Sequence, residues 1–295
     1  MMLEEAVEFL EAEYSDRTEE QSNTTNNDTS IRKRSAKQAQ ALVNGDASSS
    51  TTTEERNNHT TPPSTTTTTT PPAKGWEIIV VSDGSTDSTI SVALEHARKH
   101  RNSSGSIRVV ALSSNRGKGG AVTHGLRHVR GAYVGFADAD GASKFADLRK
   151  LINASASVAD TEGRAFAVGS RAHLVGSETV VKRSALRNFL MHSFHLLLRL
   201  LTPPATSRIR DTQCGFKLMT RSALPYIVPH MHSEGWIFDV EMLMLAERAG
   251  IPMVEVPVGW HEVKGSKLNV LWDSLGMAWG LAILRMAWAV GVYQT

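Results

Sequence analysis

The sequence predicts an α/β domain built on a mainly parallel β-sheet with flanking helices. Four short runs rich in β-branched and other apolar residues have the composition of buried strands, at 77–81, 107–112, 132–137 and 165–168. Segments with apolar residues at helical spacing separate them, at 86–99, 119–129 and 144–155. Because right-handed crossovers join such units, the loops after the strands meet at one edge of the sheet, where open α/β sheets bind ligands.

The predicted sheet begins only after Trp76. Before it, residues 3–14 place apolar side chains at helical spacing and predict a short amphipathic helix. Residues 15–75 are largely Ser, Thr, Asn, Pro and charged residues, with an unbroken threonine run at 65–70. A segment of this composition buries too little apolar surface to offset the entropy lost on ordering, so we expect a disordered insert.

The second half of the chain adds two strongly apolar helices. Residues 186–201 are amphipathic with a broad apolar face, and residues 268–292 are apolar and rich in tryptophan. Between them we expect a surface helix at 238–249 and a strand at 253–258. Two interpretations of the apolar helices stay open: ordinary core helices, or amphipathic helices that lie in a bilayer interface.

Composition and charge exclude several classes of protein. The 295 residues carry 32 basic and 30 acidic side chains, a net charge of +2, which argues against a protein held to nucleic acid by bulk charge. The single cysteine, Cys214, rules out a disulfide within the chain. No run of about 18 uninterrupted apolar residues is present, so we expect any action at a membrane to take place from its surface.

Two polar loops follow the first two predicted strands. The first contains Ser82, Asp83 and Gly84, a pattern that also fits a plain strand–turn–helix junction. The second, NRGKGGA at 115–121, opens the next helix. Its glycines let backbone amides approach a ligand closely, Lys118 adds positive charge, and a helix N-terminus favours phosphate. The alternative for this second loop is a flexible cap without a ligand.

Two carboxylates follow the third strand. Asp138 and Asp140 are two residues apart in the string ADADG. Unpaired carboxylates beside an apolar strand are costly, and side chains at this spacing can share one face and hold a hard divalent cation. Such a cation keeps positions open for diphosphate oxygens. The alternative is a solvated turn with two exposed aspartates.

Several strings of the sequence resemble a known enzyme family. In chain order they are SDGSTDST, NRGKGGAV, ADADGASKF, VGSRAHL, IRDTQCGFKLMTR, WIFDVEML and EVKGSKL. Together they are similar to the inverting GT-A glycosyltransferases that use nucleotide-diphosphate sugars, and within these to the dolichyl-phosphate β-glucosyltransferases. The resemblance implies a Rossmann-like GT-A domain at 76–265, to which the helix at 1–14 also belongs, and amphipathic membrane-interface helices at 266–295.

The resemblance also implies roles for individual residues. The catalytic residues it implies are Asp140, Asp239 and Arg171. The substrate-binding residues it implies are Ser82, Asp83, Gly84, Lys118, Gly119, Asp138, Arg210, Lys217 and Lys267. Among these, Asp83 is expected at the uracil base, Asp239 at the acceptor, and the basic residues at phosphates. Asp138 and Asp140 are expected to hold Mg²⁺ or Mn²⁺. For each basic residue, a solvated surface charge is the alternative.

The implied reaction transfers glucose from UDP-glucose to dolichyl phosphate at the cytosolic face of the endoplasmic reticulum membrane, with no nucleic-acid partner. The oligomeric state stays open. Two other functions are possible: another polyprenyl-phosphate sugar transferase, such as a mannose synthase, and a non-catalytic sugar-nucleotide binder. The binder is considered because the family begins with a membrane-spanning helix and a nucleotide-cradling strand, neither of which the sequence contains. We therefore expect a truncated sequence and a sheet that lacks a central strand.

Overall fold

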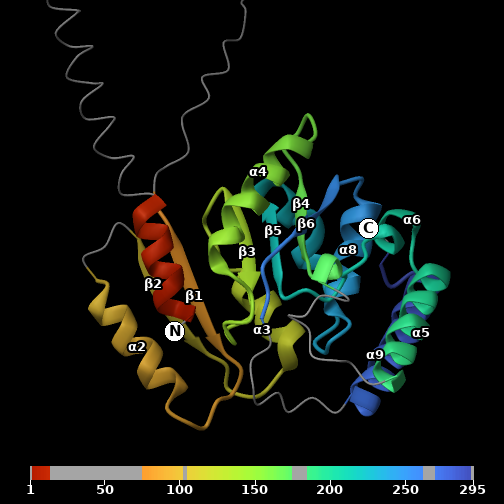
Figure 1. Ribbon diagram of the computed structural model, residues 1–295, viewed down its shortest axis with the longest axis horizontal. Helices are drawn as coiled ribbons and strands as arrows, with labels where there is room; N and C mark the ends of the chain where they lie inside the picture. The colour runs from red at the N-terminus through yellow and green to blue at the C-terminus, as the bar shows by residue number, and fades with distance from the viewer. Residues whose placement is uncertain (1, 14–74, 102–104, 175–184, 262–269, 294–295) are drawn as a thin grey trace, which may run out of the picture. The chain divides into compact units, whose positions relative to one another are not determined.

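Figure 1 shows a computed structural model of the protein, which describes residues 2–13, 75–101, 105–174, 185–261 and 270–293. Residues 2–11 and the described residues from Trp76 onward form one compact unit. Nearly all of the expected disordered insert, and Lys267, lie outside the described residues.

The secondary structure confirms most of the predicted segments. The strands are β1 (Glu77–Ser82), β2 (Ser106–Ala111), β3 (Tyr133–Ala137), β4 (Phe166–Ser170), β5 (Phe216–Thr220) and β6 (Met253–Pro257). After a first helix at 2–13, the α-helices are α2 (Thr89–Lys99), α3 (Gly117–Leu126), α4 (Leu148–Val158), α5 (Ala185–Leu201), α6 (Pro204–Arg208), α7 (Leu224–Ile227), α8 (Phe238–Arg248) and α9 (Val270–Ala289). Helix α2 begins three residues later than predicted, because the Asp87 carboxylate accepts the Thr89 amide at 3.0 Å and holds a turn there.

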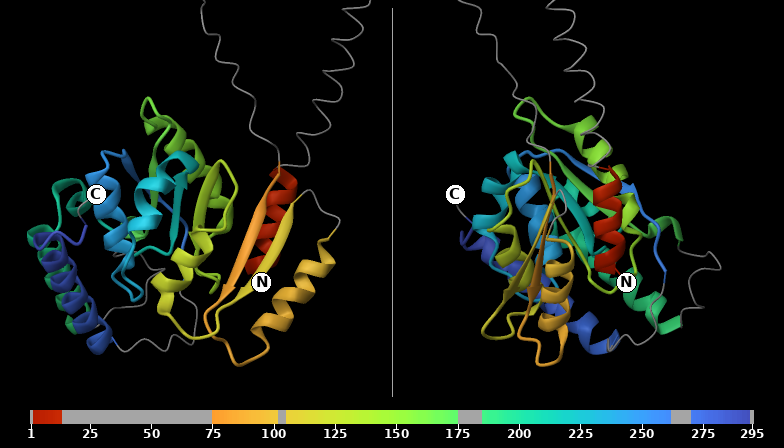
Figure 2. Two further views of the ribbon diagram at one scale, coloured as in Figure 1. Left: turned by 180° about the vertical axis from the view of Figure 1, so that it is seen from behind. Right: turned by 90° about the vertical axis from the view of Figure 1, so that its left-hand side faces the viewer.

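The strands form two sheets (Figures 1 and 2). Strands β1 and β2 pair in parallel. The second sheet has the order β3-β5-β4-β6, in which β4 and β6 are parallel and β5 runs antiparallel to both of its neighbours. Among the described strands, none joins β1 to β3, which is the arrangement expected of a sheet that lacks a central strand.

Strand β5 corrects the sequence prediction, which placed no strand at 216–220. All five of its residues are buried, yet the segment is short and Lys217 interrupts its apolar run, so its sequence lacks the usual strand signal. Because β5 lies between β3 and β4, these two strands are not direct neighbours. The sheet is therefore mixed within an α/β fold that keeps its flanking helices.

The core lies on both faces of the four-stranded sheet. Phe166 and Val168 pack with α8, whereas Ala167 between them packs with Leu151 of α4, as the two-residue period of a strand requires. Helix α8 is buried at every position from 238 to 246. It is thus an interior helix, and the surface helix expected there is wrong. Each large apolar side chain buried in this way contributes about 1.5–3 kcal/mol.

Helices α5 and α9 lie side by side at the edge of the unit, far from β2 (Figures 1 and 2). Phe194 of α5 and Leu281 of α9 belong to the core. The other faces expose large apolar side chains: Leu196, Leu200, Leu275, Trp279, Ile283 and Met286. The core interpretation therefore holds for one face of each helix, and the bilayer interpretation of the exposed faces stays a prediction. Among the described helices, none has the length and apolarity needed to cross a membrane.

Candidate active site

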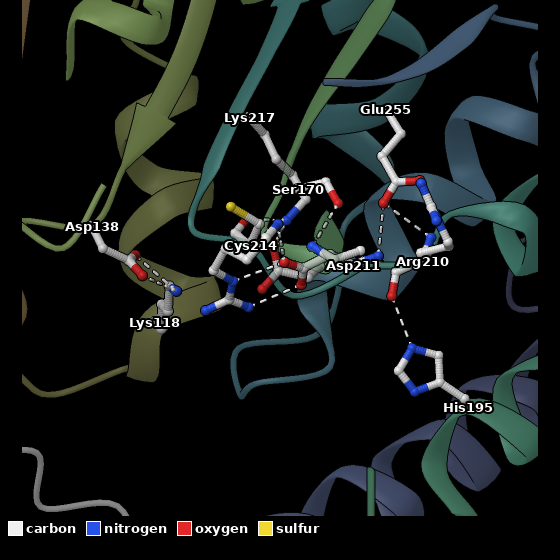
Figure 3. A network of polar contacts seen from close by, with 12 residues as sticks. Lys118, Asp138, Ser170, His195, Arg210, Asp211, Cys214, Lys217 and Glu255 are labelled. Carbon is white, nitrogen blue, oxygen red and sulfur yellow. Dashed lines mark hydrogen bonds and ion pairs between the residues drawn. The ribbon is translucent and has the colours of Figure 1, made fainter. Parts of the chain in front are cut away.

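The predicted polar residues meet at one edge of the four-stranded sheet. Because β5 runs opposite to β3 and β4, its first residues lie beside the last residues of those strands. Asp138 follows β3, Arg171 follows β4, and Cys214 precedes β5. The N-terminal ends of α3 and α8 supply Lys118 and Asp239. Figure 3 shows polar contacts at this edge, among them the Lys118–Asp138 pair and the hydrogen bond from Lys217 to the Cys214 carbonyl.

Lys118 and Asp138 point toward one another (Figure 3). The Lys118 ammonium lies 2.8 Å and 2.9 Å from the two carboxylate oxygens of Asp138. It also lies 5.6 Å from the centre of the Trp236 ring, within the range of a cation–π interaction. The glycine-rich loop and the first aspartate of the pair are thus in contact, as their positions after neighbouring predicted strands suggest.

Gly215 is a site residue that the sequence analysis missed. Its carbonyl accepts the Asp138 amide at 2.9 Å. A Cβ atom at position 215 would lie 1.9 Å from Asp138 Oδ2, closer than any side chain could tolerate. The Asp138 carboxylate therefore lies directly over a backbone that has to be glycine. The only available signal was a glycine immediately before an unrecognised strand.

Asp140 has different surroundings from Asp138. It is exposed, and its Oδ1 accepts the Ala142 amide at 2.9 Å, which stabilises a turn at Gly141 with a φ of +76°. It lines a surface cleft whose other acidic members are Glu4, Glu5 and Glu8. Within the described part of the chain, Asp140 has no ion pair, and no group of three or more His, Cys, Asp or Glu side chains could hold a metal ion.

Arg171 forms a bidentate pair with Asp211. Arg171 Nε and Nη2 lie 2.7 Å and 2.9 Å from the two carboxylate oxygens, and the Arg171 amide donates to the same carboxylate at 2.8 Å. Burial alone would raise the pKa of Asp211, but the hydrogen bonds and charge of Arg171 outweigh burial and hold this pKa below its ordinary value. The guanidinium also lies 5.8 Å from the centre of the Trp260 ring. Arg171, which was predicted to bind a phosphate, therefore already has its charge neutralised by Asp211.

Lys217 and Asp239 correct the sequence prediction. Lys217 is 0% exposed and Asp239 is 2% exposed, so neither can touch a substrate in this structure. The Lys217 ammonium donates to Asp239 Oδ1 at 2.5 Å and to the Cys214 carbonyl at 2.7 Å. The physical reason lies in the strand period: Lys217 pairs in register with Val168, on the face of the sheet that α8 covers. The pair lies beneath the site rather than in it.

Arg210 lies at the periphery of the network (Figure 3). Its side chain is 75% exposed and lies 3.7 Å from Glu255. Glu255 also accepts the amides of Arg210 and Asp211, at 3.1 Å and 3.0 Å, and His195 Nε2 lies 2.8 Å from the Arg210 carbonyl. Glu255 and His195 were missed by the sequence analysis, although an acid inside the apolar run MVEVP was a usable signal.

The loops after β1 and β2 are joined through Asp83. Its carboxylate accepts the Arg116 amide at 2.7 Å, and its carbonyl accepts the Asn115 side chain at 3.1 Å. Gly84 has a φ of +74°, which the turn between these loops requires. Ser82 is buried, and its hydroxyl has no hydrogen-bond partner among the described residues. The two loops predicted to act together are therefore brought together.

The amides of Gly119 and Gly120 were expected to face a phosphate, but in the structure they bind a carbonyl of the protein. Both donate to the carbonyl of Glu234, at 2.8 Å and 3.2 Å, because the segment before α8 crosses the N-terminus of α3. The expectation that Gly119 offers its amide to a substrate is therefore not met in this structure. Glu234 is a further residue that the sequence analysis did not identify.

Comparison with known proteins gives a consistent result. A model of the glycosyl transferase family 2 matches residues 64–227. A dolichyl-phosphate β-glucosyltransferase of Saccharomyces cerevisiae is 49% identical over 226 residues, which are 74% of this chain and 67% of that protein. The protein of the same name from Homo sapiens is 42% identical over 220 residues, 74% of this chain and 66% of that protein. The chain thus spans about two thirds of the length of these curated relatives.

Solved structures support the fold alone. Glucosyl-3-phosphoglycerate synthase from Mycobacterium tuberculosis in complex with UDP aligns with a TM-score of 0.51 at 18% identity, over 70% of this chain and 68% of that chain. The same enzyme with Mn²⁺, UDP and glucosyl-3-phosphoglycerate also has a TM-score of 0.51, over 71% of this chain and 68% of that chain.

Proposed function

Because the chain belongs to glycosyl transferase family 2, and within it to the dolichyl-phosphate β-glucosyltransferases, we propose that it transfers glucose from UDP-glucose to dolichyl phosphate. The reaction inverts the anomeric carbon and gives dolichyl β-D-glucosyl phosphate, the glucosyl donor for protein N-glycosylation. The observation that carries this proposal is the identity to relatives of that name over three quarters of the chain. The gathering of acids and bases at the sheet edge supports it.

The sugar donor binds along the loops after β1, β2 and β3 in this proposal. Asp83 and Gly84 form the turn that receives the uracil base, next to the buried Ser82. Lys118 and Arg171 are cations at this edge of the sheet that can neutralise diphosphate charge. Their present partners, Asp138 and Asp211, show how readily each takes an anion.

A divalent cation fits the carboxylates of this site. Asp140 is exposed, Asp138 follows the same strand, and three glutamates make the adjoining cleft acidic. Carboxylate oxygens are the ligands that Mg²⁺ and Mn²⁺ prefer, and one or two of them suffice where substrate phosphates complete the coordination. Asp140 would hold the cation, with Asp138 beside it. Such a cation supplies positive charge to the leaving diphosphate.

The chemistry places few demands on a general base. The acceptor phosphate is already ionised at neutral pH, so the attacking oxygen needs no deprotonation. The larger task is to stabilise the charge that develops on UDP as it leaves, which preorganised cations do well. Asp239 is buried against Lys217, so we assign to this pair the support of the site from below instead of base catalysis.

The acceptor is a lipid, and the exposed faces of α5 and α9 offer a surface for it. Apolar side chains on two adjacent helices can enter the acyl boundary while charged residues stay at the headgroups. The acceptor phosphate lies at that same depth. Since relatives named dolichyl-phosphate β-glucosyltransferase support this acceptor, we propose the endoplasmic reticulum membrane, at its cytosolic face, as the location of the protein.

A transfer assay tests the proposed function. The chain is incubated with dolichyl phosphate in vesicles, Mn²⁺ and radiolabelled UDP-glucose or GDP-mannose, and the labelled lipid is extracted. The proposal expects label from UDP-glucose only. Label from GDP-mannose would instead identify a mannose synthase. UDP binding in a calorimeter without any lipid product would identify a non-catalytic sugar-nucleotide binder. In that case the pairing of Lys118 and Arg171 with acids of the protein would be the observation that fits the binder.

A further inference from the structure

The segment 232–236, which precedes α8, occupies the N-terminus of α3. The Glu234 carbonyl accepts the amides of Gly119 and Gly120 at 2.8 Å and 3.2 Å. The Glu234 carboxylate accepts two hydrogen bonds from the Arg116 guanidinium, one of them from Nε at 2.9 Å. One residue therefore provides both the oxygen and the negative charge that a phosphate would bring to this helix end.

The glycines of the loop are shaped around this segment. A Cβ atom at position 117 would lie 2.6 Å from the Glu234 carbonyl oxygen, at a φ of +76°. A Cβ atom at position 119 would lie 2.4 Å from the Ser233 carbonyl oxygen. Both distances are too short for any side chain, so only glycine at positions 117 and 119 lets the carbonyls of Ser233 and Glu234 come this close. A phosphate of the sugar donor would need glycine at these positions for the same reason.

Several groups of the loop that could bind a diphosphate already have partners within the protein. Arg116 pairs with Glu234, and Lys118 pairs with Asp138 under the Trp236 ring. The two glycine amides share the Glu234 carbonyl. A diphosphate can reach these groups only if the segment withdraws or the partners exchange.

The ends of the segment are fixed, whereas its middle is open. Glu241, 0% exposed, accepts the amides of His232 and Ser233 at 2.8 Å and 2.9 Å and the Tyr293 hydroxyl at 2.5 Å. Helix α8 begins directly after the segment. Between these anchors the Glu234 side chain is 47% exposed. A Cβ atom at Gly235 would meet no other heavy atom within 4 Å.

We propose that residues 233–236 form a latch that occupies the diphosphate position of the empty enzyme and is displaced when UDP-glucose binds. This inference rests on the proposed function, because it assigns the displaced ligand. The Arg116–Glu234 pair is half exposed, and pairs of that kind contribute little free energy, so a diphosphate with two charges can displace it. A single anion gains less at these groups than a diphosphate does, so the latch favours the nucleotide over it. Its closed fraction lowers the apparent affinity for UDP.

Calorimetry with UDP and Mn²⁺ tests the latch. Glu234→Ala removes its charge, and Glu162→Ala is the matched control, since Glu162 is also exposed and lies 3.5 Å from an arginine at the opposite end of β4. We expect Glu234→Ala to bind UDP about two- to fivefold more tightly, the range of an exposed ion pair. The control should bind UDP like the parent chain.

Unchanged or weaker UDP binding by Glu234→Ala overturns the latch but leaves the proposed function intact, because the parent chain still binds UDP. Absence of UDP binding by all three chains overturns both proposals. A second measurement uses a glutamyl endopeptidase, which cuts after Glu234 only when the segment is accessible. We expect UDP to accelerate cleavage between residues 234 and 235, and an unchanged or slower cut would contradict displacement.

Discussion

Asp138 and Asp140 differ in ways that their spacing does not reveal. Asp138 is paired with Lys118 and lies over Gly215, whereas Asp140 is exposed and bonds only its own turn among the described residues. The exposed carboxylate is therefore the one available to a cation. The position of the Asp138 carboxylate, in contrast, depends on Lys118 and Gly215. The two aspartates therefore lead to separate predictions.

Asp140→Ala should lower kcat in the transfer assay by about 100-fold or more, because the charge developing on the leaving group loses its counter-ion. The melting temperature should stay close to that of the parent, since Asp140 is exposed. Glu162→Ala serves again as the control and should keep full activity. Turnover near the parent value in Asp140→Ala would mean that the cation is held elsewhere.

Gly215→Ala should separate Asp138 from Lys118, because the new methyl group would lie 1.9 Å from Asp138 Oδ2. We expect the free energy of unfolding to fall by about 1–3 kcal/mol, as for overpacked sites. We also expect the activity to fall by more than the unfolded fraction of the variant accounts for. Gly276→Ala is the matched control, since a Cβ atom there meets nothing within 4 Å. Denaturant unfolding and the transfer assay measure the two effects. Full activity in Gly215→Ala would show that the position of Asp138 is unimportant.

The buried Lys217–Asp239 pair is a matter of stability. Lys217→Met leaves a carboxylate buried without a partner, so the free energy of unfolding should fall by about 3–5 kcal/mol. The double variant Lys217→Met, Asp239→Val removes both charges and should recover a large part of that loss. Urea denaturation followed by circular dichroism compares the two. A double variant that is less stable than the single one would contradict this account of the pair.

At the scale of elements, the sequence predicted those segments whose pattern is local. Strands such as β1 and helices such as α4 follow their own periodicity, and the loops after β1, β2 and β3 could be selected because each follows a strand. Strand β5 could not, since Lys217 disrupts its apolar pattern and only its pairing partners and α8 make a buried lysine acceptable. A related reason explains why α8 was wrongly predicted to be a surface helix. Its acids Asp239 and Glu241 are typical of a surface helix, and only the structure shows that they have the buried partners Lys217 and Tyr293.

The α5–α9 pair leads to a prediction on membrane binding. Replacing Leu196, Leu200, Trp279 and Met286 together by Ser removes exposed apolar surface without touching the core. The variant should lose flotation with liposomes, while its thermal stability changes little. The control variant replaces the exposed Val92 and Leu94 of α2 by Ser and should float like the parent. A quadruple variant that floats normally would show that these helices do not face the bilayer.

At the scale of the whole molecule, the site depends on residues far apart in the chain. Asp83, Asp138, Arg171, Asp211 and Glu234 come from five separate segments. Arg171 pairs with Asp211, Lys118 pairs with Asp138, and Arg116 contacts both Asp83 and Glu234. These contacts depend on the antiparallel insertion of β5 and on the segment before α8, neither of which the sequence pattern predicted. The sequence analysis therefore named the candidate residues, whose roles stay predictions, but it did not name their partners Gly215, Glu234 and Glu255.

The hydrogen bond from Tyr293 to Glu241 has a consequence for the order in which the protein folds. Its two residues are 52 positions apart, and a ribosome makes Glu241 well before Tyr293. Because domains fold as units, Glu241 gains all of its donors only once residue 293 is part of the folded domain. The segment that covers the N-terminus of α3 is fully anchored only after residue 293 has been synthesised. Through Glu241, the folding of the segment before α8 is thus coupled to the chain that follows α9.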